Sequence, residues 1–170
     1  MINNSIIKVF LIYFTIFIFC GIANAEKSLP FADKVLVKKH DRMMFLIKNG
    51  KPYREYHISL GDSPVGHKTQ EGDERTPEGI YIIDYRNPKS SYTLSLHINY
   101  PNSLDKSKAK KRGVSPGGQI FIHGSPNGMS LTEVALTKMD WTDGCIAVTN
   151  DEIRELWKLV KNGTPIEILP

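Results

Sequence analysis

The chain has 170 residues, of which 41% are hydrophobic, and 22 lysines and arginines stand against 18 aspartates and glutamates. This composition is ordinary for a water-soluble globular protein and suffices for one domain with one core. The net charge of +4 is modest. Its one dense basic cluster has no interleaved aromatic residues, which argues against nucleic acid as a partner. We expect that cluster to be a solvated loop rather than an anion-binding patch; it consists of Lys106, Lys108, Lys110, Lys111 and Arg112.

The first 25 residues have the pattern of an export signal. A polar start with Lys8 precedes the apolar run 9–22, and Ala23-Asn24-Ala25 is a small-x-small cleavage site. An uncleaved anchor helix is the alternative, but 14 apolar residues are short for a span of about 20. Phe19 before Cys20 argues against a lipoprotein. We therefore expect a signal peptide over 1–25, a single domain over 26–170 in the periplasm, and no membrane span after cleavage.

Strands are predicted along most of the mature chain. Asn49-Gly50 between two strand-like segments is a strong hairpin signal. Two stretches rich in glycine, proline and polar residues, 61–77 and 101–118, are predicted as loops. The predicted strands are 34–38, 42–48, 53–60, 79–83, 93–98, 119–123 and 164–169.

One helix is predicted near the C-terminal end. Thr149 and Glu152 form a capping box, and Gly163 provides the stop. One apolar face follows from the spacing of Ile153, Leu156, Trp157 and Val160. The chain is therefore expected to be mainly β, a sandwich or barrel-like sheet with this helix and short helical segments.

The pair of residues that indicates chemistry is Cys145 and His123. Once residues 1–25 are removed, Cys145 is the only cysteine, and an exported thiol without a partner is a candidate nucleophile. His123 lies 22 positions earlier, at the end of a predicted strand, and a histidine can take the proton of a thiol and return it to a leaving amine. Each residue alone fits a core position, but together, with Gly124 and Gly144 beside them, they favour catalysis.

The segments around this pair resemble the L,D-transpeptidases with a YkuD-type catalytic domain. The resemblance is carried by His123-Gly124, by Thr142-Asp143-Gly144-Cys145-Ile146 and by the upstream run Arg75-Thr76-Pro77-Glu78-Gly79, and it covers about 33–169. The family has a histidine where Asp143 stands and an asparagine or arginine where Ala147 stands. The spacer between histidine and cysteine is also longer here.

The resemblance implies a role for each residue of the site. Cys145 would be the nucleophile and His123 the proton acceptor and donor, oriented by the carbonyl of Gly124. The backbone N–H groups of Gly144 and Cys145 would bind the oxyanion. Candidate substrate contacts are Thr142, Asp143, His67 and Tyr100. No metal is expected, because His97, His123 and Cys145 match no compact zinc spacing.

The implied reaction is acyl transfer on peptidoglycan stem peptides in the cell envelope. It would form L,D cross-links or exchange the terminal D-amino acid, without a cofactor, with an amine or a wall-anchored protein as acceptor. An L,D-carboxypeptidase or other peptide hydrolase using the same Cys–His pair is the first alternative. A non-catalytic wall-binding envelope protein is the second, because a fold does not fix a function.

Overall fold

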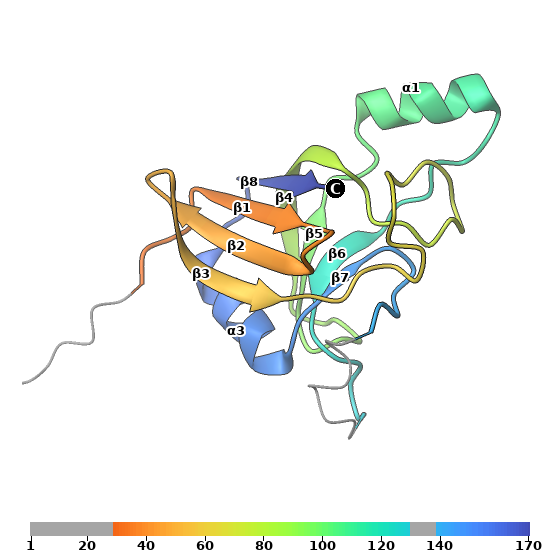
Figure 1. Ribbon diagram of the computed structural model, residues 1–170. Coiled ribbons are helices and arrows are strands. Elements are labelled where there is room, and N and C mark those ends of the chain that lie inside the picture. Colours follow the sequence, from red (N-terminus) through yellow and green to blue (C-terminus); the bar gives the residue numbers. More distant parts are fainter. Residues whose placement is uncertain (1–28, 130–138) are drawn as a thin grey trace, which may run out of the picture.

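The computed structural model describes residues 29–129 and 139–170, so the proposed signal segment 1–25, with Cys20, lies outside the described residues. The described chain forms one curled, eight-stranded sheet with two helices (Figure 1). The elements are β1 (Lys34–Lys38), β2 (Met43–Lys48), β3 (Lys51–His57), β4 (Gly79–Asn87), β5 (Ser95–Ile98), α1 (Ser103–Arg112), β6 (Ile120–His123), β7 (Ile146–Ala147), α3 (Asn150–Leu159) and β8 (Thr164–Leu169). The mainly β fold expected from the sequence is thus confirmed.

The strands are arranged in the order β3-β2-β1-β8-β4-β5-β6-β7. β1 pairs with β8, and β6 with β7, in parallel, while the other neighbours are antiparallel. β3 and β7 stand at opposite ends of this order, but the segment that follows β3 pairs with β7, since Ser59 forms a β-bridge with Ala147. The sheet is therefore curled nearly closed, and its two ends meet beside β7.

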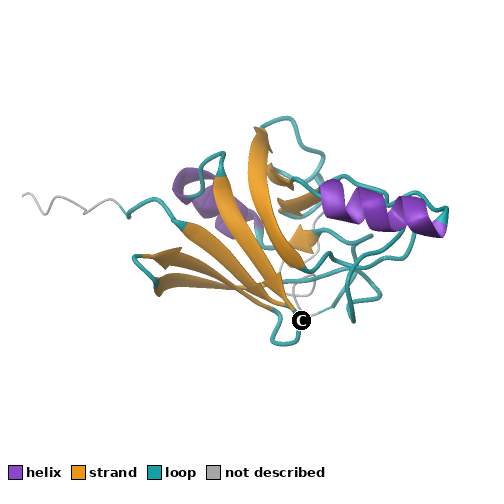
Figure 2. Cartoon of the chain, turned by 90° about the horizontal axis from the view of Figure 1, so that it is seen from above, coloured by secondary structure: helices purple, strands orange, loops and turns teal. Residues whose placement is uncertain are grey.

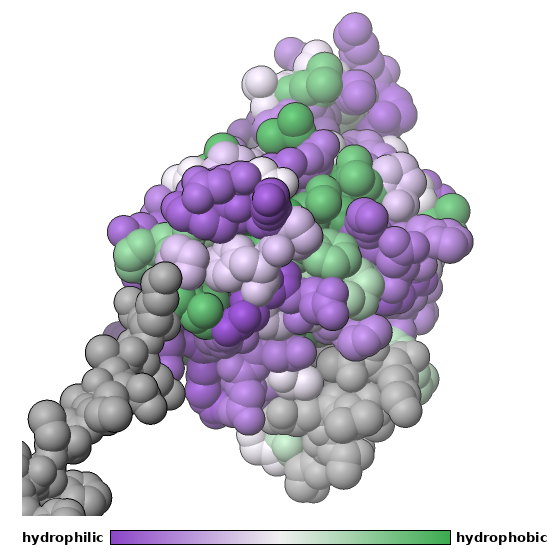
Figure 3. All heavy atoms as spheres, turned by 60° about the vertical axis from the view of Figure 1, so that its left-hand side comes forward, coloured by the Kyte–Doolittle hydropathy of each residue, from purple (hydrophilic) through white to green (hydrophobic). Residues whose placement is uncertain are grey.

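Burial alternates along β1 and β8, and along β2 as far as Leu46. Asn49 and Gly50 take the positive φ values that their tight hairpin turn requires. α3 lies against the sheet, at the opposite end of the domain from α1 (Figure 2), and buries Ile153, Leu156 and Leu159. Hydrophilic side chains dominate the face seen in Figure 3, with apolar residues in small patches between them.

Besides β4, which continues to Asn87 rather than ending at Ile83, and β5, which begins at Ser95 rather than Thr93, three predicted elements need correction. β3 covers 51–57 rather than 53–60, because the chain leaves the ladder with β2 and turns toward β7 at Ser59. α3 begins after Thr149 with the predicted capping box, but it ends at Leu159. Val160 is already extended and fully buried in the core, and Gly163, with φ of 90°, serves the turn before β8 instead.

The third correction concerns 101–118, predicted as a loop, which contains α1. This helix has no apolar stripe, so hydrophobic periodicity could not reveal it. Its start is fixed by a reciprocal capping box between Asn102 and Asp105, and it ends at Gly113 in the left-handed conformation. Only Asp105 and Ala109 are buried, and the basic cluster lies on this helix rather than in a loop.

Asp105 anchors α1 to the sheet. Its carboxylate accepts hydrogen bonds from the N–H of Asn102 at 3.0 Å and from the Tyr81 hydroxyl at 3.1 Å, and it lies 3.3 Å from Nε2 of His67. This carboxylate is buried, and without it the N–H of Asn102 would lose its acceptor and the Tyr81 hydroxyl would keep only the longer contact of 3.3 Å with the carbonyl oxygen of Glu78.

We predict that Asp105→Ala lowers the free energy of unfolding by about 2 kcal/mol, through loss of the cap and of the buried hydrogen bonds. Urea unfolding followed by circular dichroism measures this. Ser107→Ala, on the exposed side of the same helix, is the matched control and should change little. Equal stability of the two variants would contradict the anchoring role.

Candidate active site

His123 closes β6 and is almost fully buried, with 4% of its surface exposed. Its Nδ1 lies 2.7 Å from the carbonyl oxygen of Gly124. A carbonyl can only accept, so Nδ1 carries the proton and Nε2 is the nitrogen left to accept one. Burial lowers the pKa of His123 below its ordinary value, against the opposing effect of the Gly124 carbonyl. The imidazole is therefore neutral at neutral pH, the form that a general base requires.

Cys145 precedes β7, and the parallel pairing of Ile122 with Ile146 aligns it beside Phe121 of β6. Its Sγ lies 3.5 Å from the carbonyl oxygen of Gln119. Burial raises the pKa of the Cys145 thiol to about 11, and the carboxylate of Asp143 acts in the same direction. The N–H of Phe121 and the ammonium of Lys68 oppose this rise. The resting site therefore holds a neutral thiol and a neutral imidazole rather than an ion pair.

The turn that presents Cys145 is held by Thr142. The Thr142 hydroxyl donates to the carbonyl oxygen of Cys145 at 2.8 Å and accepts from the N–H of Gly144 at 3.2 Å. Gly144 has φ of 120°, and a Cβ there would lie 2.5 Å from the carbonyl oxygen of Arg75. Only glycine fits this position, because both the backbone conformation and the space exclude a side chain.

At Gly124 the lack of space alone favours glycine. A Cβ on Gly124 would lie 2.6 Å from Oδ1 of Asn150 and 2.9 Å from the Ile153 side chain. The same Asn150 oxygen accepts from the N–H of Ser125 at 3.0 Å and from the Thr93 hydroxyl at 2.6 Å. The start of α3 therefore packs directly against the peptide that orients His123.

A cavity of about 510 Å³ is lined by both His123 and Cys145. The rings of Tyr92 and Trp141 flank the imidazole, with centroids 4.5 and 5.7 Å from it. Thr142 and Asp143, two of the candidate substrate contacts, also line this cavity. Tyr92 is a lining residue that the sequence did not predict, because its loop, Ser90-Ser91-Tyr92, carries no motif.

A second hollow meets this cavity at Gly118, Gln119 and Asp143. Its other walls come from the two predicted loop regions, with Lys68, Glu71 and Gly72 on one side and Ser115 and Gly117 on the other. The space beside Cys145 therefore continues into a groove between these segments.

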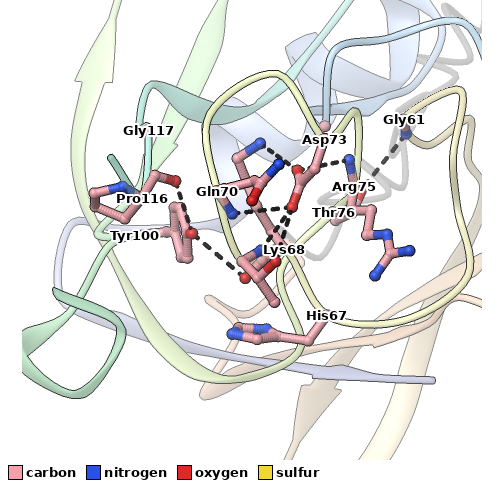
Figure 4. Close-up of polar contacts among 12 residues, drawn as sticks. Gly61, His67, Lys68, Gln70, Asp73, Arg75, Thr76, Tyr100, Pro116 and Gly117 are labelled. Carbon is pink, nitrogen blue, oxygen red and sulfur yellow. Dashed lines mark hydrogen bonds and ion pairs between the residues drawn. The ribbon is translucent and has the colours of Figure 1, made fainter. Parts of the chain in front are cut away.

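His67 and Tyr100, the two remaining candidate substrate contacts, are not part of the cavity that Cys145 lines. Nδ1 of His67 accepts from the N–H of Glu78 at 2.9 Å, so Nε2 donates to Asp105. Tyr100 is 3% exposed, and its hydroxyl donates to the carbonyl oxygen of Pro116 at 2.9 Å (Figure 4). His67 therefore helps to hold α1 in place, and Tyr100 helps to hold the loop that follows α1.

Within the described residues, 29–129 and 139–170, no group of three or more His, Cys, Asp or Glu side chains is arranged to hold a metal ion. Neither helix of that part of the chain is long and apolar enough to cross a bilayer.

We predict that alkylation of Cys145 by iodoacetamide accelerates about tenfold per pH unit between about pH 7 and about pH 10, because the thiolate fraction keeps growing up to the raised pKa. Mass spectrometry of the intact protein gives the rates. Free cysteine is the control and levels off above its pKa of about 8.5. A plateau of the protein rate below about pH 9 would show that the thiol is not suppressed at rest.

The comparisons with known proteins point to one family. The model of the L,D-transpeptidase catalytic domain, YkuD, matches residues 32–168. YafK of Escherichia coli K12, whose assignment as an L,D-transpeptidase is provisional, is 27% identical over 132 residues, which are 74% of this chain and 46% of YafK.

Two solved structures show the same similarity. Pgp2, a helical cell shape determining protein of Campylobacter jejuni, is 30% identical with a TM-score of 0.58, over 83% of this chain and 50% of Pgp2. Bd1075 of Bdellovibrio bacteriovorus is 30% identical with a TM-score of 0.54, over 82% of this chain and 48% of Bd1075. The chain spans about half the length of these relatives. From its match to the family model over nearly all the described residues, the chain belongs to the L,D-transpeptidase catalytic domain family.

Proposed function

We propose that this chain is a cysteine-dependent acyltransferase that acts on peptidoglycan stem peptides in the cell envelope. The observation that carries the proposal is the shared cavity of Cys145 and His123, in which Nδ1 of His123 is committed to Gly124 and Nε2 is free to accept a proton. Membership of the L,D-transpeptidase family supports the reaction class. The proposed signal at 1–25 would deliver the chain to the periplasm.

In the first half-reaction, Sγ of Cys145 attacks the carbonyl carbon of the L-centre residue before the terminal D-amino acid. The thiol proton passes to Nε2 of His123 as the S–C bond forms. The C–N bond then breaks, and His123 gives this proton to the departing amine, which leaves a thioester on Cys145. Because the thiol and the imidazole are both neutral at rest, the proton transfer accompanies the attack.

In the second half-reaction, an acceptor amine attacks the thioester carbonyl and loses its proton to His123. The C–S bond breaks, and the proton returns to the Cys145 sulfur. The product is an L,D cross-link when the amine belongs to a second stem peptide, and an exchanged terminus when it belongs to a free D-amino acid. A wall-anchored protein would be the third kind of acceptor.

Backbone N–H groups beside the sulfur would stabilise the oxyanion of each tetrahedral intermediate. The N–H of Gly144 already donates to the Thr142 hydroxyl at 3.2 Å, so an oxyanion would compete with that hydroxyl for it. We therefore assign the main oxyanion contact to the N–H of Cys145, with Gly144 as the second donor.

The similarity to Pgp2, a protein that determines helical cell shape, extends the proposal to a biological role. Changing the cross-links or trimming the stem peptides would change the shape of the wall. We propose that this chain acts on cell shape through its action on stem peptides.

We predict that the mature protein converts a disaccharide-tetrapeptide into a cross-linked dimer with loss of one terminal D-amino acid, and that Cys145→Ala and His123→Ala abolish the product. Mass spectrometry of the reaction mixture measures this. The thermal unfolding of both variants is checked in parallel. Tyr53→Ala, on β3 and outside the cavity that Cys145 lines, is the control variant and should stay active.

Each product pattern decides between the functions. Tripeptide monomer without dimer would assign the chain to the carboxypeptidase reaction, with water as acceptor. Absence of both products and of a thioester on Cys145 would overturn the enzymatic proposal.

We also predict that kcat/KM falls on the acid side with a midpoint below about pH 6.5, the ordinary value for histidine, because burial holds the pKa of His123 down. Above that midpoint the imidazole is neutral and the rate is full, and below it the base is protonated. Tyr92→Ala removes a ring that covers His123 and should move the midpoint upward. A midpoint above about 6.5 in the unaltered protein would contradict this assignment.

A further inference from the structure

Three aromatic side chains lie in register across β4, β5 and β6. Tyr85 pairs with His97, and His97 pairs with Phe121. The Tyr85 and His97 rings are stacked at 4.4 Å and 20°, and Phe121 meets His97 edge-on at 4.9 Å. We call these three residues the aromatic row. It faces away from the core, because both strand neighbours of His97, Leu96 and Ile98, are fully buried on the other face.

The aromatic row leads to the candidate nucleophile. Ile122 and Ile146 pair with each other and are both fully buried, so the residues before them, Phe121 and Cys145, share the opposite face. Phe121 also lines the cavity that contains Cys145. The row therefore continues, strand by strand, from the sulfur out to Tyr85, which is 42% exposed.

A hollow of about 860 Å³ with a polar rim adjoins this row at its middle residue, His97. His97 lines it, and Nδ1 of His97 lies 2.6 Å from Oδ1 of Asp84, which is also in the wall. Asn99, Ser103 and Lys106 add amide, hydroxyl and ammonium groups. The hollow shares Gly118 and Gln119 with the cavity of Cys145, so a ligand can extend from one into the other.

Aromatic rings beside hydrogen-bonding side chains suit a sugar. A pyranose presents an apolar face of C–H groups, which packs on an aromatic ring, and a rim of hydroxyl and acetamido groups, which pair with carboxylate, amide and ammonium groups. Cross-strand aromatic packing alone would stabilise the sheet. It would not require an exposed ring or a polar hollow that opens toward the nucleophile.

The spacing fits the substrate. Neighbouring strands lie about 4.8 Å apart, so His97, two strands from Cys145, is about 10 Å from it. In a tetrapeptide stem the attacked carbonyl belongs to the third residue from the sugar, and three extended residues span about 10 Å. A carbonyl at Cys145 thus puts the sugar near His97, with Tyr85 on the next strand outward.

We propose that the aromatic row, with the hollow beside it, binds the N-acetylated amino sugar to which the donor stem peptide is attached. The proposal rests on the proposed function, since it assigns the glycan part of the same substrate. It makes Tyr85 and Asp84 determinants of specificity for glycan-linked over free peptides.

The test compares two substrates, a disaccharide-tetrapeptide and the same tetrapeptide without sugars. Tyr85→Ala should lower kcat/KM about tenfold for the first and leave the second unchanged, because it removes only the exposed ring. Tyr85→Trp should restore the preference. Tyr53→Ala, a half-buried aromatic beside a separate hollow on β3, is the matched control and should change neither value. Equal effects of Tyr85→Ala on both substrates, or none on either, would overturn the proposal.

A binding measurement separates this proposal from the proposed function. The Cys145→Ala protein is titrated with the peptide-free disaccharide, and chemical shifts are followed by NMR. Shifts at His97 and Phe121 that disappear in a Tyr85→Ala background support the sugar site, even if the unaltered protein turns over neither substrate. Absence of shifts there up to millimolar disaccharide would overturn it.

Discussion

The site depends on the parallel pairing of β6 with β7, which is only two residue pairs long. It pairs His123, the last residue of β6, with Ala147, the last residue of β7, and so brings the histidine close to Cys145, which lies 22 positions later in sequence. So short a strand needs support from both sides. On one side, the N–H of Val148 donates to the carbonyl of His123 at 2.9 Å. On the other, Ser59 and Ala147 exchange two hydrogen bonds of 2.9 Å. Curling of the sheet, which carries the segment after β3 to β7, therefore helps to hold Cys145 and His123 at one cavity.

Close backbone contacts make this arrangement rigid. The turn before Cys145 lies against Arg75, and Gly61 bridges to Thr142. The loop that supplies these contacts is ordered by Asp73, which pairs with Lys68 at 2.8 Å and accepts from three backbone N–H groups (Figure 4). Although burial acts to raise it, the pKa of Asp73 is held at about 2 by these donors. The carboxylate that shapes the loop therefore stays charged throughout the physiological range, and the loop remains a fixed wall for the turn.

The sequence predicted those parts that are set by local pattern. The alternation in 34–38, the Asn49-Gly50 turn and the Thr149 capping box each depend on residues close together in the chain, and each is found where expected. α1 was not predicted because it has no apolar stripe. The buried carboxylate that holds it, Asp105, has partners at positions 67 and 81, which are distant in sequence. Cys145 and His123 could be paired from the sequence by their chemistry and by family resemblance. Tyr92 and Phe121 could not, since their place in the cavity follows from strand register and loop packing.

The charges around Cys145 bear on the role of nucleophile that we propose for it. Asp143 stands where the family has a histidine, and its negative charge disfavours a thiolate, while Lys68 opposes it from the other side of the groove. A preformed thiolate–imidazolium pair would need two charges in a buried site, which costs free energy unless both are well solvated. In the mechanism that we propose, proton transfer to His123 during the attack would avoid this cost, because the negative charge would move at once from sulfur to the carbonyl oxygen and its backbone donors. The substrate would then create the reactive state, and an empty site would keep its thiol protonated.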